Sequence, residues 1–149
     1  AGNRGEVEIN SWFRDDWRPL DRVEAMRGLE TLRWSRGDLL QIVSELEPEK
    51  MDEQREGERW SIRGVLAHIA TAEWWYLDRF GLIAARNELP KDPFERLAVV
   101  RQRLEQALPD LAGVEKVFGL EGEFWSPRKL LRRALWHELD HIGHIAHLL

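Results

Sequence analysis

Apolar residues recur at helical spacing in four segments of the chain. The first segment covers residues 21–46, where apolar positions follow one another at steps of three, four and seven. They are Val23, Met26, Leu29, Leu32, Leu39, Val43 and Leu46. This spacing predicts a long helix that buries these side chains on one face, and Pro48 is expected to stop it.

A second helix is predicted to begin after Ser61, a residue type that caps helix N-termini, and to fade between Gly81 and Arg86. The side chains expected to face inward are Ile62, Val65, Ile69, Ala72 and Tyr76. His68 lies beside this row on the helical wheel. We therefore expect His68 to point toward the core.

The last two helices each start with a capping residue followed by proline, at Asp92-Pro93 and at Ser126-Pro127. The third helix is predicted to end before Pro109, and its inward row is Phe94, Leu97, Val100 or Val99, Leu104, Ala107 and Leu108. The row of the fourth helix is Leu130, Ala134, His137, His141, Ile145 and Leu148. Histidines thus replace apolar residues at two core-facing positions of the last helix.

The segments between these helices show no sustained period. Residues 47–59 are rich in charge and residues 111–125 contain glycines, so both are predicted to be connections. Residues 1–20 are predicted to form an N-terminal arm, irregular or with a short helix, whose aromatic residues need cover from the helices or from a partner chain. Residues 21–149 are predicted to form an all-α, antiparallel four-helix bundle.

Composition removes several classes of function. A net charge of −5 gives no broad positive field for nucleic acid, and no apolar run approaches the roughly 20 residues of a membrane span. We therefore expect neither partner. The chain has no cysteine, which excludes disulfides, a thiol nucleophile and a cysteine-based zinc site. A cytoplasmic location is the expectation.

The clearest chemical pattern is the histidine pair at positions 137 and 141. Residues four apart lie one above the other on a helix, so His137 and His141 would present two imidazoles on one face, opposite His68. Buried imidazoles need hydrogen-bond partners, and several protonated together repel one another. A divalent cation would relieve both problems, and three ligands would leave positions open, as in catalytic sites. The alternative is that these are ordinary polar residues near a helix end.

Residues 137–141 also match H-E-x-x-H, the zinc-protease signature in which Glu138 would be the general base. The longer metzincin pattern would take His147 as its third ligand. Its glycine position is occupied by His144, however, and the glycine stands one residue earlier, at Gly143. No predicted strand offers a substrate-binding edge either. We therefore disfavour a peptidase.

Other polar residues near the pair have less definite roles. His144 is interpreted as a helix-end histidine, with an alternative ligand or supporting group as the second possibility. His147 is expected to face solvent or a subunit contact. Glu138 and Asp140 are expected to be surface charges, with support of the metal ligands or acid–base catalysis as the alternative. Glu73 lies too far round the helix from His68 to be a ligand.

Two motifs together resemble the DinB/YfiT-like family of metal-binding four-helix bundles. They are WSIRGVLAHI at residues 60–69, followed by EWW at residues 73–75, and H-x-x-x-H-x-G beginning at His137. The resemblance covers about residues 22–149. It implies a zinc or nickel ion bound by His68, His137 and His141, and it implies a homodimer. Relatives often carry Arg-Gly-Gln after the last ligand, where this chain has Ile142-Gly143-His144, so any substrate-orienting role of that Arg and Gln is not expected here.

Characterised members of the family include thiol-dependent enzymes, such as mycothiol-dependent maleylpyruvate isomerase and bacillithiol transferases. The resemblance therefore implies a metal-dependent enzyme that activates a low-molecular-weight thiol, or water, for transfer to a small electrophile. Trp75 and Trp136 are candidates to wall the pocket, and Arg132 and Arg133 to hold a carboxylate; core packing and a solvated face are the respective alternatives. A non-catalytic metal-binding or dimerisation module of a stress-related protein is the second hypothesis.

Overall fold

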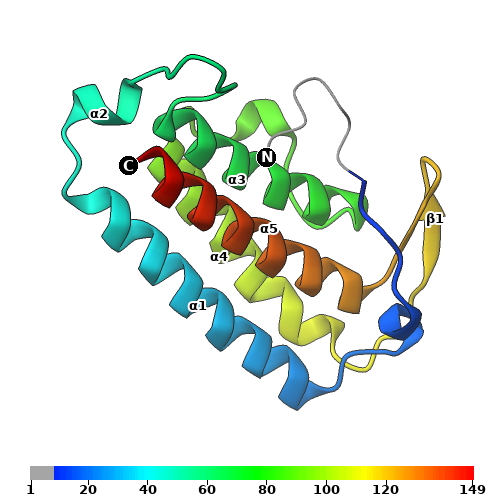
Figure 1. Cartoon of the computed structure of the whole chain (residues 1–149). Coiled ribbons are helices and arrows are strands. Elements are labelled where there is room, and N and C mark those ends of the chain that lie inside the picture. The colour runs from blue at the N-terminus through cyan, green and yellow to red at the C-terminus, as the bar shows by residue number, and fades with distance from the viewer. Residues whose placement is uncertain (1–8) are drawn as a thin grey trace.

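The structure is a computed structural model that describes residues 9–149. Four long helices lie side by side (Figure 1): α1 (Arg22–Ser44), α3 (Ile62–Arg79), α4 (Pro93–Leu111) and α5 (Pro127–Leu148). The smaller elements are the 3-10 helices η1 (Arg14–Trp17) and η2 (Arg86–Glu88), the helix α2 (Pro48–Asp52), and the strands β1 (Phe118–Leu120) and β2 (Glu123–Trp125). The predicted all-α class is confirmed. The part of the predicted arm before Ile9 lies outside the described residues.

Each long helix starts at a side-chain cap. Asp21 accepts a hydrogen bond from the Glu24 backbone N–H at 2.7 Å, and its own N–H donates to the Glu24 carboxylate at 3.2 Å. Ser61, Asp92 and Ser126 accept in the same way from the backbone three residues on. These bonds satisfy N–H groups that have no partner within the helix, so the helix starts could be predicted from local sequence.

The directions of the long helices differ from pair to pair. α3 and α5 run antiparallel, because His68 contacts His137 while Tyr76 contacts Arg133. α1 and α5 run in the same direction, and their C-terminal ends lie together on the left of Figure 1. The antiparallel arrangement expected throughout thus holds for α3 with α5, whereas α1 and α5 are parallel neighbours.

The predicted core rows of α3, α4 and α5 are largely buried, and the row of α1 is buried from Leu29 to Val43. Val23 and Met26 are instead 57% and 44% exposed. The physical reason is rotation: each step of three residues falls about 60° short of a full turn of an α-helix, so two or three such steps carry Met26 and Val23 off the face that Leu32 occupies. None of the helices in residues 9–149 combines the length and apolarity needed to cross a membrane.

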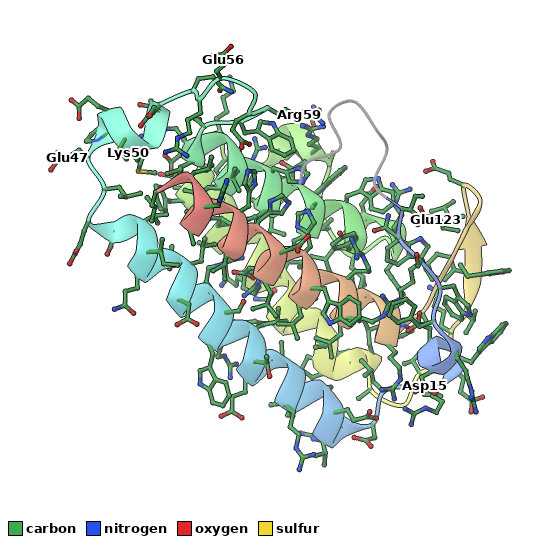
Figure 2. All side chains as sticks on the ribbon, viewed as in Figure 1. Asp15, Glu47, Lys50, Glu56, Arg59 and Glu123 are labelled. Atoms are coloured by element: carbon green, nitrogen blue, oxygen red, sulfur yellow. The ribbon has the colours of Figure 1, made fainter. Side chains whose placement is uncertain are left out.

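Three predictions about connections were wrong in detail. α1 ends before Pro48, at Ser44, as expected, but Pro48 then begins α2 within residues 47–59, which were predicted to be a connection without a helix. α4 continues through Pro109 to Leu111, because a proline in the last turn removes one hydrogen bond without preventing helical backbone after it. Charged side chains of the α1–α3 connection, such as Glu47 and Glu56, point outward as expected (Figure 2).

The third correction concerns residues 111–125, which contain a hairpin formed by β1 and β2. Its two turn residues, Glu121 and Gly122, both have positive φ, at 52° and 84°. This is the backbone that a two-residue hairpin turn requires. Each strand is only three residues long, which is too short for an alternating pattern to show in the sequence.

The described part of the N-terminal arm packs against α5 and the hairpin. Asp16 forms an ion pair with Arg132 at 2.7 Å, and the Phe13 ring meets the Trp136 ring edge-on at 5.4 Å. Trp12 contacts Phe124 of the hairpin at 5.8 Å. The arm therefore lies along the helix that carries the histidine pair.

Candidate metal centre

Three histidines meet where α3 and α5 pack together. His68 comes from α3, and His137 and His141 come from α5. Each offers a ring nitrogen that lies within 4.8 Å of the other two, and the Nε2 atoms of His68 and His137 are 3.1 Å apart. His137 is 5% exposed, and the other two are half-buried. The structure thus brings together the three residues that the sequence predicted.

The geometry follows from two rows of side chains. His137 and His141 are one turn apart on α5, so their imidazoles lie one above the other, with ring centroids 4.5 Å apart. α3 runs past them in the opposite direction and presents His68, whose ring is 4.8 Å from each. Converging side chains on two packed helices hold the cluster without a loop.

Trp60 packs against two of these histidines, His68 and His141. Its ring stacks on His68 with centroids 4.3 Å apart and an interplanar angle of 22°. Gly64 makes this position accessible, because a Cβ there would lie only 3.0 Å from the Trp60 Cβ. The role of Trp60 was missed from sequence, although Trp60 and Gly64 both belong to the motif at residues 60–69.

His144 lies one step beyond the cluster. Its Nδ1 is 3.5 Å from Nδ1 of His141, and its Nε2 is 3.1 Å from the Glu58 carboxylate. Glu58 belongs to the connection before α3, so this contact joins that connection to the end of α5. His147 is exposed, as expected. His144 is therefore a neighbour of the three histidines, and it faces a carboxylate that the sequence did not suggest.

The two tryptophans predicted as pocket walls pack elsewhere. Trp75 contacts Trp125 at 5.6 Å and lies beneath the guanidinium of Arg79, which is 4.2 Å from the ring centroid. Trp136 is 49% exposed and contacts Phe13 of the arm. Trp60 takes the position that we predicted for Trp75 and Trp136.

Beneath the histidines lies a buried network of four charged residues, one from each long helix: Arg36, Glu73, Arg101 and Glu138. The Arg36 Nε donates to the Glu138 carboxylate at 2.8 Å. Arg101 donates to Glu73 at 2.8 Å and also to Glu138. We call this set the four-helix charge network. Glu138 is 1% exposed, so the expectation that it is a surface charge was wrong.

Arg101 connects the two helices that carry the histidines. Burial lowers the pKa of its guanidinium, but the carboxylates of Glu73 and Glu138 outweigh that effect and raise the pKa above its usual value. Arg101 is thus a permanent cation between Glu73 on α3 and Glu138 on α5. Glu73 turns its carboxylate toward Arg101, in agreement with the expectation that it is not a metal ligand.

The burial of these four charged residues is indicated by their positions in the sequence. Arg36 follows Leu29 and Leu32 at core spacing, and Glu138 follows Leu130 and Ala134 in the same way. Glu73 and Arg101 continue the core rows of α3 and α4. Four charges at core-facing positions, two of each sign, indicate a compensated buried set, because unpaired buried charges are rare.

The donor set of the centre fits a divalent first-row metal ion. All three candidate ligand atoms are imidazole nitrogens. Imidazole nitrogen suits zinc, nickel, cobalt and copper, whereas calcium and magnesium prefer oxygen ligands. Three such ligands could hold an ion and leave coordination positions for another molecule.

A comparison with known protein families identifies the family of this chain. A family model for the DinB superfamily matches residues 31–145, a span that contains all of α3 and α4 and the three histidines. Comparisons with curated proteins and with solved structures find no match. The matched span covers most of the chain, and its helices carry the histidine cluster described above. The chain belongs to the DinB superfamily.

Proposed function

We propose that this chain binds a divalent metal ion, zinc or nickel, through His68, His137 and His141, and that it activates a thiol, or water, toward a small electrophilic substrate. The observation that carries the proposal is the convergence of three imidazoles from two helices, with their candidate ligand atoms within 4.8 Å of one another. Membership of the DinB superfamily supports the same interpretation. The proposed location is the cytoplasm, where low-molecular-weight thiols are kept reduced.

The bound cation would supply a positive charge that lowers the pKa of a thiol or water molecule beside it. The protein side chains have three separate tasks. The histidines provide the ligand nitrogens, the Trp60 ring stacks on His68, and Arg101 joins α3 to α5. The groups that react are then the thiol, or water, and the electrophile, and none of them is a protein side chain.

The proposed transfer is a nucleophilic substitution. The thiol gives its proton to solvent, and its sulfur donates an electron pair to the electrophilic carbon. A carbon–sulfur bond forms while the bond from that carbon to the leaving group breaks with its electron pair. The products are a thioether, the leaving-group anion and one proton, so no oxidant or reductant is needed.

The test is thiol-dependent conjugation to an aryl halide whose substitution changes its absorbance. We expect the zinc- or nickel-loaded protein to accelerate this reaction, and His137→Ala or metal removal to abolish the acceleration. His147→Ala is the matched control, because His147 is exposed on the same helix and should leave the rate unchanged. If no thiol and no electrophile reacts faster with the loaded protein, the enzymatic proposal is wrong and non-catalytic metal binding becomes the better interpretation.

We also propose that the chain forms a homodimer. Val23, Met26 and Trp34 are exposed apolar residues that lie along one side of α1, with Trp34 65% exposed. Such a row on an outer helix face is typical of a surface covered by a partner. A mass in solution near twice 17.6 kDa by light scattering would support the proposal, and a mass of one chain at all concentrations would contradict it.

A further inference from the structure

We propose that Arg133 binds a carboxylate of the molecule that completes the coordination of the metal. This inference rests on the proposed function and narrows its substrate class to thiols that carry a carboxylate a few bonds from the sulfur. Three observations carry it: the place of Arg133 on α5, the neutral character of its partners, and the contrast with the other two arginines of α5, which form ion pairs.

Arg133 continues the histidine row. Arg133, His137 and His141 are spaced four residues apart on α5 and therefore share one face, with Cβ atoms about 5–6 Å apart from turn to turn. Tyr76 of α3 stands opposite this row. Its ring lies 6.1 Å from the His137 ring, and its hydroxyl accepts a hydrogen bond from Arg133 Nη2 at 3.3 Å. The guanidinium is thus one helical turn from the cluster.

The partners of Arg133 are uncharged. Nε donates to the Asn10 side-chain oxygen at 2.9 Å, and Nη2 donates to Tyr76. Arg133 makes no ion pair with any carboxylate in residues 9–149. These two hydrogen bonds use two of the five N–H donors of the guanidinium, so three N–H donors remain for a ligand.

The other two arginines of α5 are compensated, whereas Arg96 and Arg103 of α4 have neutral partners but donate to backbone carbonyls of the connection between α3 and α4. Arg132, the preceding residue, pairs with Asp16 at 2.7 Å, and Arg128 pairs with Glu24 at 2.6 Å. Arg36 and Arg101 belong to the four-helix charge network. Removing a cation from water without a counter-charge is costly. The half-buried Arg133 has only neutral partners and lies one helical turn from the histidines, so this position favours the binding of an anion next to the metal centre.

The shape of the Arg133 guanidinium favours a carboxylate as its ligand. A guanidinium is planar and presents paired donors that match the two oxygens of a carboxylate, and its hydrogen bonds to charged acceptors are stronger than those to neutral ones. A ligand whose sulfur lies among the histidines could place a carboxylate at Arg133 only if the two groups are separated by a short chain, because one helical turn separates the sites.

The experiment uses the cobalt(II)-loaded full chain, whose absorption reports ligands that reach the metal. The probes are 3-mercaptopropionate and its uncharged amide, which differ only in the carboxylate. We expect wild type to bind the acid at least roughly tenfold more tightly than the amide, as one charge-assisted hydrogen bond allows. Arg133→Gln should bring the two dissociation constants to within about twofold, with the amide unaffected.

Arg132→Gln is the matched control, since its charge is already paired and the acid preference should persist. Arg133→Lys keeps the positive charge but loses the planar pair of donors, so it should still bind the acid more tightly than the amide, by a smaller factor. This variant replaces Arg133→Gln in the test if circular dichroism shows that Arg133→Gln does not fold. Equal affinity for acid and amide in wild type, or an unchanged preference in Arg133→Gln, would overturn the assignment while leaving thiol binding intact. No spectral change with either thiol would instead contradict the proposed thiol chemistry itself.

Discussion

Glu138 is shared by two buried arginines. Arg36 and Arg101 both donate to its carboxylate, and all three side chains are shielded from solvent. Replacing the Glu138 carboxylate removes one carboxylate partner from each of the two buried cations, which costs more than the net value of the ion pairs. The stability of the whole domain therefore depends on a residue that a motif search would assign to catalysis.

We expect Glu138→Gln to lower the free energy of unfolding by roughly 3–5 kcal/mol, measured by urea denaturation. Asp140→Asn is the control, because Asp140 is exposed two residues further along the same helix, and its change should stay within about 0.5 kcal/mol. Equal effects of the two substitutions would show that Glu138 does not carry the network.

The role of a single residue could be predicted from the sequence only where the residues that reveal it lie close together in the chain. The histidines at positions 137 and 141 share a spacing that is visible in five residues, and His68 lies beside a regular apolar row. Glu138 and Arg36 are 102 positions apart, and each one alone resembles a surface charge. Their core-facing positions are visible in the spacing of each helix, but the ion pairs that compensate them join different helices, so only the four charges taken together indicate burial.

At the scale of elements, α1 and α5 approach each other closely at Gly28. A Cβ at this position would overlap Leu131, with Cδ1 only 2.8 Å away. Gly37, also within α1, has nothing within 4 Å of the same built atom. The two glycines therefore differ in packing alone, since both occupy the interior of one helix.

This pair gives a test of the α1–α5 contact. We expect Gly37→Ala to stabilise the fold by about 0.5–1 kcal/mol, because alanine favours the helix. Gly28→Ala should destabilise it by about 1–3 kcal/mol through overpacking against Leu131. Thermal unfolding followed by circular dichroism measures both. Stabilisation by both substitutions would contradict the close approach of the two helices.

The starts of α1 and α5 are joined by Glu24 and Arg128. The hydrogen bond from the Arg128 guanidinium is the main cause that lowers the pKa of Glu24 from 4.5 to about 2. A carboxyl with a lower pKa in the folded state stabilises the fold above pH 4.5, and this contribution is lost as the pH falls from 4.5 through about 2.

We therefore expect wild type to exceed Glu24→Gln in unfolding free energy at pH 6, and the difference to shrink by pH 2.5. The Glu24 side chain is 34% exposed, so solvent screening limits the difference to below about 1 kcal/mol. Glu30→Gln, an exposed change on the same helix, should show no such pH dependence. A Glu24→Gln effect that is constant with pH would argue against this ion pair.

The elements themselves were predictable to different degrees. Caps such as Ser61 and Ser126 act within four residues, so the helix starts agreed with expectation. The hairpin was not foreseen, because its strands gain stability from pairing with each other and from cover by the arm. Proline is compatible with both a first and a last helical turn, so the start of α2 at Pro48 and the continuation of α4 past Pro109 were not predicted.

For the whole molecule, the amphipathic period of each helix was enough to predict an all-α protein. The parallel course of α1 and α5 was not predictable from these periods, because helix direction depends on how the connections cross the ends of the helices. The same packing brings one charge from each long helix together beneath the histidines. The charge network and the histidine cluster are thus two consequences of one arrangement.

The central claim is that this arrangement holds one metal ion at His68, His137 and His141. The most direct measurement is elemental analysis of the protein purified without an affinity tag, comparing wild type, His68→Ala, His141→Ala and His147→Ala. We expect about one divalent ion per chain in wild type and in the exposed-site control His147→Ala, and little metal in the other two variants. Equal metal content in all four proteins would contradict the account.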